Sequence, residues 1–230
     1  MNEKILFFDA GPVITLVMAR LAWILPELKK RFGGKFYITP AVKYELVDRP
    51  LTVRRFEFEA LEVMKMIRDG IFEMYEKVPN TKVSVLKKLA NSAFTMQNRT
   101  MDVLQAGEVE SVASALQEKN AGVVMDERTL RLLIESNKDM KSLLERRFKK
   151  DVSVNLTKMN EFSQNFKNVP ITRSIELVSV AYNLGLLDSY LPKRRDAKST
   201  LLDAVLWATK FNGCAVTEHE IEEIKQFLLK

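Results

Sequence analysis

The chain has 230 residues, 47% of them hydrophobic and 9% aromatic, which is enough apolar material for one globular domain with a sizeable core and excludes a disordered chain. Lysine and arginine outnumber aspartate and glutamate by 36 to 30, a mild basic excess of +6. One cysteine and one histidine exclude an internal disulfide and a Cys/His zinc site, and no apolar run reaches the ~20 residues that a membrane span needs.

The first 50 residues alternate between strand and helix patterns. We expect a strand over 4–8, a helix over 12–31, a strand over 35–38 and a helix that Thr39 and Pro40 open. Short strands that alternate with helices are typical of right-handed βαβ units, so the pattern predicts an α/β fold with a parallel sheet.

The middle of the chain continues with helical periods and two further strands. The expected elements are a helix over 51–69, a strand over 71–75, a helix over 81–104, a helix that starts at Gly107 and a strand over 121–125. The expected strand over 121–125 is followed directly by Asp126, just as the strand over 4–8 is followed by Asp9.

After Asp126 the pattern is mostly helical. We expect helices over 128–136, up to Lys150 and over 171–184, a short strand over 152–154, and a last helix that a capping box at Thr217 opens. Nothing resembles a linker between two independent domains. Residues 1–230 are therefore expected to form a single α/β domain.

Asp9 and Asp126 have the same setting, because each follows the end of a buried strand. The carboxyl ends of strands in open α/β sheets form the edge where ligands bind, so we expect the two acids to meet there. Carboxylates that converge raise each other's pKa, and a bound cation usually offsets their charge. With only oxygen donors available, the ion that fits is Mg²⁺ or Mn²⁺.

Glu45 and Glu108 lie on helices that follow chain reversals and are candidates for the same site. Each also has a simpler interpretation. Glu108 is in the first turn of its helix, where a negative charge complements the helix dipole, and Glu45 fits a solvent-exposed helix face.

Four segments together resemble the successive blocks of a PIN domain. They are Phe8-Asp9-Ala10-Gly11-Pro12, the stretch from Thr39 to Glu45, the stretch from Gly107 to Ala115, and Val124-Met125-Asp126-Glu127-Arg128. The resemblance covers residues 3–50 and 105–135, and continues more weakly through 171–187. It implies a three-layer α/β/α sandwich around a parallel sheet, with helical insertions at about 51–104 and 136–170 and a C-terminal helical part over 171–230.

The resemblance also implies a metal-dependent endoribonuclease that hydrolyses RNA phosphodiester bonds. Carried over residue by residue, Asp9, Glu45, Glu108 and Asp126 would be both the catalytic acids and the ligands of Mg²⁺ or Mn²⁺. Glu110 is an alternative to Glu108, and Glu127 is a candidate for an acid just outside the ligand set. The chain departs from many members of the family at Glu108, where they have Asp, and at Met125, which offers no hydrogen bond to Asp126.

Several basic residues are candidates for contacts with RNA. Arg128 and Arg131 share a helix face and either bind backbone phosphates or pair with nearby acids. Expected partners are RNA, an antitoxin-like protein if the chain is a toxin of a toxin–antitoxin pair, and a second copy in a homodimer. We expect a cytoplasmic location and no membrane. The alternatives are a PIN-like module that binds nucleic acid with little or no nuclease activity, and a scaffold that binds a protein partner.

Overall fold

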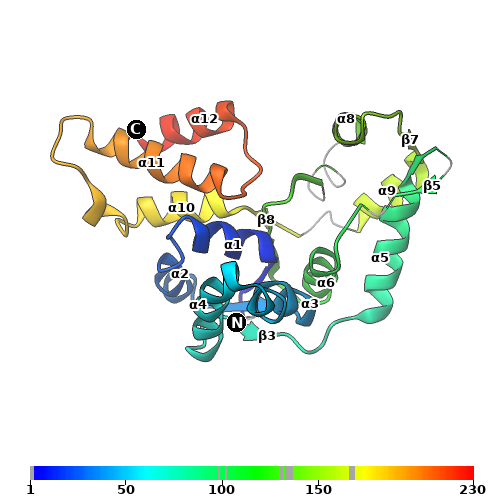
Figure 1. Cartoon of the computed structure of the whole chain (residues 1–230), viewed down its shortest axis with the longest axis horizontal. Helices are drawn as coiled ribbons and strands as arrows, with labels where there is room; N and C mark the ends of the chain where they lie inside the picture. The colour runs from blue at the N-terminus through cyan, green and yellow to red at the C-terminus, as the bar shows by residue number, and fades with distance from the viewer. Residues whose placement is uncertain (1–2, 98, 102, 130–131, 133–136, 166–168) are drawn as a thin grey trace.

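Five short parallel strands form the central sheet of the computed structural model, which describes residues 3–97, 99–101, 103–129, 132, 137–165 and 169–230 (Figure 1). The strands are β1 Ile5–Phe8, β2 Lys35–Ile38, β3 Glu73–Met74, β6 Ala121–Val124 and β8 Ile171–Thr172, in the spatial order β3-β2-β1-β6-β8. β1 lies at the centre, where it pairs in parallel with β2 on one side and with β6 on the other. The predicted α/β class with a parallel sheet is confirmed.

Helices cover both faces of this sheet. Side chains from one face of β1 and β6 pack on α1 Ala10–Met18, α2 Ile24–Phe32, α4 Glu57–Arg68, α10 Ser174–Asn183, α11 Ala197–Phe211 and α12 Glu218–Leu228. Side chains from the other face pack on α5 Asn80–Ala93, α6 Ala106–Ala115, α8 Asn137–Phe148 and α9 Leu156–Gln164.

The alternation of side chains along β1 produces the two cores. Phe8 belongs to the first core, while Ile5 and Phe7 belong to the second, because successive residues of a strand point to opposite faces. The three phenylalanine and isoleucine side chains are all buried. Two apolar layers on one sheet make a three-layer α/β/α sandwich, as expected.

The single helix predicted over 12–31 is wrong. The structure has two helices there, α1 and α2, and the chain turns between them at Arg20, whose φ is +59°. Pro26 explains the break, because it lacks an N–H group and its ring would clash with the carbonyl four residues earlier in a continuous helix. In the first turn of α2 neither property matters.

The helix predicted over 81–104 is also too long, and the insertions are not purely helical. α5 ends at Ala93, and a small antiparallel sheet follows with the order β5-β4-β7. Its strands are β4 Phe94–Met96, β5 Arg99–Thr100 and β7 Ser153–Val154. This sheet joins the two insertions and, with α5, α8 and α9, forms the lobe on the right of Figure 1, whereas α4 of the first insertion packs in the core on the other face of the central sheet.

Further along the chain, Ile171 and Thr172 form the edge strand β8 rather than the start of a helix, and α10 begins at Ser174. The capping box at Thr217 opens α12 as predicted. The helix predicted over 128–136 lies mostly outside the described residues. Among the helices of the described ranges, none combines the length and the apolar character that crossing a membrane requires.

Candidate metal centre

Asp9 and Asp126 lie next to each other at the carboxyl edge of the sheet. The Asp9 N–H donates to the Val124 carbonyl at 3.0 Å, which fixes the end of β1 beside the end of β6. A Cβ atom on Gly11 would lie 3.4 Å from Asp9 Oδ2 and 3.6 Å from the Asp126 Cβ, so the glycine sits directly against both acids. Asp9 and Asp126 therefore lie close together, as their positions at the ends of two strands predicted.

Glu45 reaches the same edge from the segment after β2. Thr39 caps the short helix α3 Pro40–Lys43, and the chain then continues into one turn of π-helix, Tyr44–Asp48, which carries Glu45. Single π turns are rare and often occur at functional sites. A Cβ on Gly107 would lie 3.2 Å from Glu45 Oε1, so Glu45 lies against the start of α6.

Glu108 is in the first turn of α6 and completes the group. Its Oε2 accepts a hydrogen bond from the Gln105 N–H at 2.9 Å, which caps the helix. Glu108, Asp9 and Asp126 are each at most 5% exposed. Four acids from four separate segments therefore converge on one sheet edge. We call Asp9, Glu45, Glu108 and Asp126 the acidic centre.

The pKa values report how strongly burial, and then the neighbouring charges, disfavour the ionised form of these carboxylates. Burial raises the pKa of Asp9 from 3.8 to about 7, and the charges of Glu45 and Asp126 add to this rise. Burial raises the pKa of Glu108 from 4.5 to about 8, with further contributions from the charges of Asp9, Glu127 and Glu45. The pKa of Glu45 is also raised, again mainly by burial. In the acidic centre, burial and the proximity of the other acids thus make the ionised forms of Asp9 and Glu108 unfavourable without a counter-charge.

Hydrogen bonds hold Asp126 more firmly than the other acids. Its Oδ1 accepts from the Ser174 N–H and its Oδ2 from the Ser174 hydroxyl, both at 2.7 Å. The carboxylate therefore ties β6 to the start of α10. Each carboxylate oxygen has a second lone pair, so these bonds leave Asp126 able to contact a cation as well.

The two neighbouring acids have structural partners. Glu110 Oε2 accepts from the Ala41 N–H at 3.0 Å and so satisfies the first turn of α3. Glu127 accepts from the N–H of Thr129 at 3.1 Å and from its hydroxyl. These contacts give both acids a role in positioning the chain around the centre.

Of the two arginines predicted to contact RNA, the structure describes one. Arg128 directly follows Glu127, and its Nε is buried without a hydrogen-bond partner among the residues that the structure describes. Arg131 lies outside the described residues.

The donor set of the acidic centre suits a hard divalent cation. All its donor atoms are carboxylate oxygens, and a positive charge would offset the burial and the smaller repulsion that raise the pKa values of Asp9 and Glu108. As the side chains stand, no three acidic, histidine or cysteine side chains within the described ranges are arranged to hold a metal ion. Asp126 and Glu108 instead use their oxygens on Ser174 and Gln105. Chelation would therefore require side chains of the acidic centre to change position.

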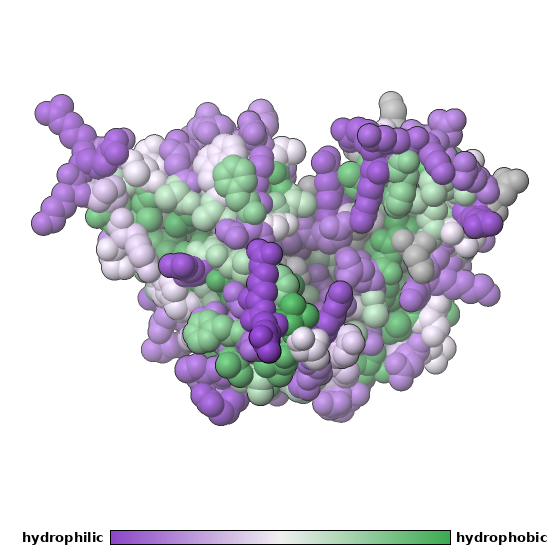
Figure 2. Space-filling model, in the orientation of Figure 1, coloured by the Kyte–Doolittle hydropathy of each residue, from purple (hydrophilic) through white to green (hydrophobic). Residues whose placement is uncertain are grey.

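A groove with positive charge adjoins the acidic centre. Glu108 and Glu127 form part of its wall, and Lys87 of α5 and Arg147 of α8 form another part, around a volume of about 350 Å³. Phe148 also lines this groove, with the Arg147 guanidinium 5.7 Å from its ring centre. Figure 2 shows a hollow bordered by hydrophilic side chains between the C-terminal helices and the insertion lobe.

Ser174 and Lys87 were missed from the sequence. A signal for Ser174 was present, because polar residues at 172–174 directly follow a short apolar segment and precede a helix. No local signal identified Lys87, because only the folding of the insertion brings α5 to the acidic centre. Comparisons of the chain with models of known protein families, with curated proteins and with solved structures found no match.

Proposed function

We propose that the chain is a divalent-metal-dependent ribonuclease of the PIN type, which hydrolyses RNA phosphodiester bonds at the acidic centre. The observation that carries the proposal is the convergence of four carboxylates on one sheet edge, three of them buried and that of Glu45 partly buried, with the pKa of Asp9 raised to about 7 and that of Glu108 to about 8. Buried charges of one sign are costly unless a counter-charge joins them.

Asp9, Glu45 and Glu108 would hold the ion, and Asp126 would contact it through an oxygen that also accepts from Ser174. When bound, Mg²⁺ or Mn²⁺ supplies positive charge for the phosphate oxygens and lowers the pKa of a coordinated water. The chain positions the carboxylates, and burial of Asp9 and Glu108 favours their protonated form until a positive charge joins them. Burial excludes bulk water from Asp9 and Glu108, which strengthens every charge interaction there.

The groove beside the acidic centre supports a nucleic-acid substrate. Lys87 and Arg147 would bind backbone phosphates, and the exposed ring of Phe148 offers a surface for a base. Single-stranded RNA fits best, because its bases are free to stack while its phosphates reach a narrow site. We propose that the protein acts in the cytoplasm, where such RNA is available.

The test is cleavage of a fluorescent single-stranded RNA by purified protein with Mn²⁺. We expect products with 5′-phosphate and 3′-hydroxyl ends, loss of cleavage with EDTA, and a rate at least ~10²-fold lower for Asp9→Asn. Glu57→Gln is the matched control, because Glu57 is an exposed acid on α4 outside the acidic centre. Equal rates for Asp9→Asn and the parent would remove the proposal.

A second function is favoured by one observation. Both oxygens of Asp126 are hydrogen-bonded to Ser174, which suits a structural role and leaves fewer free ligands. A PIN-like module that binds RNA with little or no hydrolysis fits this arrangement. RNA that binds to metal-loaded protein and stays intact would identify it. A small acidic protein that co-purifies would support a toxin–antitoxin pair, and a doubled mass in solution would support a homodimer.

A further inference from the structure

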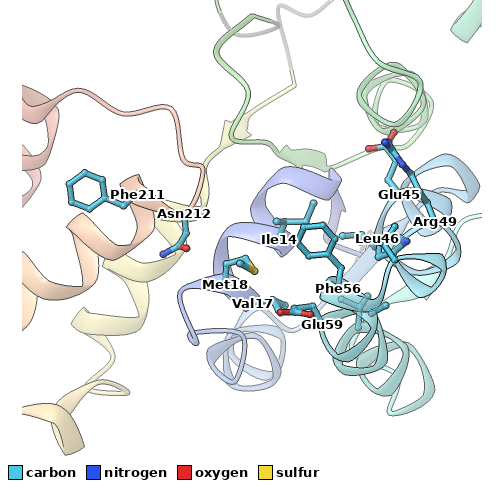
Figure 3. A pocket seen from close by; sticks show the side chains of 14 residues that line it. Ile14, Val17, Met18, Glu45, Leu46, Arg49, Phe56, Glu59, Phe211 and Asn212 are labelled. Atoms are coloured by element: carbon cyan, nitrogen blue, oxygen red, sulfur yellow. The ribbon is translucent and has the colours of Figure 1, made fainter.

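A mostly apolar groove of about 510 Å³ opens next to the acidic centre, with Glu45 in its wall (Figure 3). Helix α1, the π turn with Glu45, helix α4 and the end of α11 provide its walls. Ile14, Met18, Val53 and Phe56 line it and are 38–44% exposed, although they are large apolar side chains. Exposed apolar side chains that gather around one concave site commonly mark a ligand pocket, and the volume is that of a small-molecule site.

One polar atom in this groove lacks a partner. Glu59 Oε2 is buried and accepts no hydrogen bond from the described part of the chain, and Glu59 forms no ion pair there either. A buried carboxylate oxygen without a donor is unfavourable, because it has lost water and gained nothing in exchange. The groove therefore lacks a hydrogen-bond donor at the position of Glu59.

The groove is also continuous with the proposed catalytic site. Glu45 belongs to the acidic centre and lines the groove, and Arg49 lies beside it. In Figure 3, Phe56 lies between the end with Glu45 and the end with Glu59. A nucleotide whose phosphate is near Glu45 and Arg49 would extend its base over Phe56 toward Glu59.

We propose that this groove binds a nucleobase of the RNA substrate and that Glu59 makes it select guanine. The proposal rests on the proposed function and adds to it the base preference of the site. Phe56 and Ile14 supply the flat apolar surface on which a base stacks, and the Glu59 carboxylate accepts hydrogen bonds from the base edge.

Guanine is the base whose edge matches a carboxylate. Its ring N1–H and its exocyclic amino group are adjacent donors, so both oxygens of Glu59 would accept, as they do from an arginine fork. Adenine and cytosine offer a single amino group beside an acceptor nitrogen, and uracil offers one N–H between two carbonyl oxygens. A carboxylate would meet repulsion from those acceptors.

A protein side chain or a second copy of the chain is a less suitable occupant. A stable protein interface buries about 800 Å² on each partner, whereas this groove is a confined volume with a polar atom in its wall. An apolar helix would leave Glu59 Oε2 without a donor. A base satisfies the apolar walls and the carboxylate together.

The test is titration of the full-length protein, with Mg²⁺ present, by guanosine, inosine and adenosine 5′-monophosphates in isothermal calorimetry. We expect the guanine nucleotide to bind about 10-fold tighter than inosine monophosphate, which lacks the exocyclic amino group, and tighter still than the adenine nucleotide. Glu59→Gln should remove most of this difference. Phe56→Ala should weaken all three nucleotides alike, and Glu57→Gln, on the same helix, should change nothing.

Any one of three results would overturn the proposal: equal affinities for the three nucleotides, a guanine preference that survives in Glu59→Gln, or no nucleotide binding. A dimer that dissociates in Phe56→Ala would also overturn it, because the groove would then be an interface. Failure of the nuclease proposal gives a different result, since guanine-selective binding would persist while RNA stays intact. Circular dichroism of Glu59→Gln establishes that the variant is folded.

Discussion

Asp9→Asn should stabilise the metal-free protein, although it removes a residue from the proposed active site. Burial is the main cause that raises the pKa of Asp9 from 3.8 to about 7, and the charges of Glu45 and Asp126 add to it. Asparagine has the same shape and still offers an oxygen to the Gly11 N–H, which donates to Asp9 Oδ2 at 3.3 Å. The substitution therefore removes an unfavourable charge with little change in packing.

The size of the effect follows from linkage. The unfolded chain releases the Asp9 proton near pH 3.8 and the folded protein near pH 7, so the folded state carries more protons between these values. Its stability therefore falls as pH rises through this window. The full penalty above pH 7 is about 4 kcal/mol, and at pH 5 it is about 2 kcal/mol. Asp9→Asn should remove most of it at pH 8 and less at pH 5.

The assay is urea unfolding in EDTA at pH 5 and pH 8, followed by circular dichroism. The parent should gain stability from Mn²⁺ at pH 8, and Asp9→Asn should gain little. Glu57→Gln, which removes an exposed charge, should change the free energy of unfolding by less than about 0.5 kcal/mol. A variant that is less stable than the parent at pH 8 without metal would refute the view that the acidic centre carries uncompensated charge.

Three further outcomes follow from the same geometry. Ser174→Ala should lower the free energy of unfolding by about 2 kcal/mol in the same urea assay, because it removes a buried hydrogen bond to the charged carboxylate of Asp126. Ser179→Ala on the same helix removes only a hydrogen bond to a backbone carbonyl and should have a smaller effect. The double variant Lys87→Ala, Arg147→Ala should bind single-stranded RNA with a smaller salt dependence, because two phosphate contacts are lost: the slope of log affinity against log salt, measured by fluorescence anisotropy, should fall by about 1.4. The double variant Lys30→Ala, Arg31→Ala makes an equal change of charge on α2 and should leave the slope unchanged. Mn²⁺ should raise the melting temperature more at pH 9 than at pH 6, because protons compete with the ion for Asp9 below about pH 7 and for Glu108 below about pH 8. An increase that does not depend on pH would mean that the ion binds elsewhere.

The strand ends and their acids were predictable because the signals are local. Apolar runs at 5–8 and 121–124 stop at Asp9 and Asp126, and parallel strands bring such ends to one edge. The break between α1 and α2 was not apparent, because the apolar period continues through it. Pro26 was the available signal for that break.

Contacts over long sequence separations could not be predicted. Ser174 meets Asp126 from 48 positions further along the chain, and β7 pairs with β4 across about 60 residues. Single-sequence patterns report helix and strand periods but not which distant segments pair. For the same reason no local pattern placed Lys87 beside the acidic centre or Glu59 in the adjoining apolar groove.

The most direct test of the central claim is the anomalous difference density of a crystal grown at pH 8 and soaked in Mn²⁺. We expect one strong peak at the carboxyl edge of the sheet, about 2.1 Å from oxygens of Asp9, Glu45 and Glu108, and no peak in Asp9→Asn crystals treated alike. A fully soaked parent crystal without a peak among these carboxylates would contradict it.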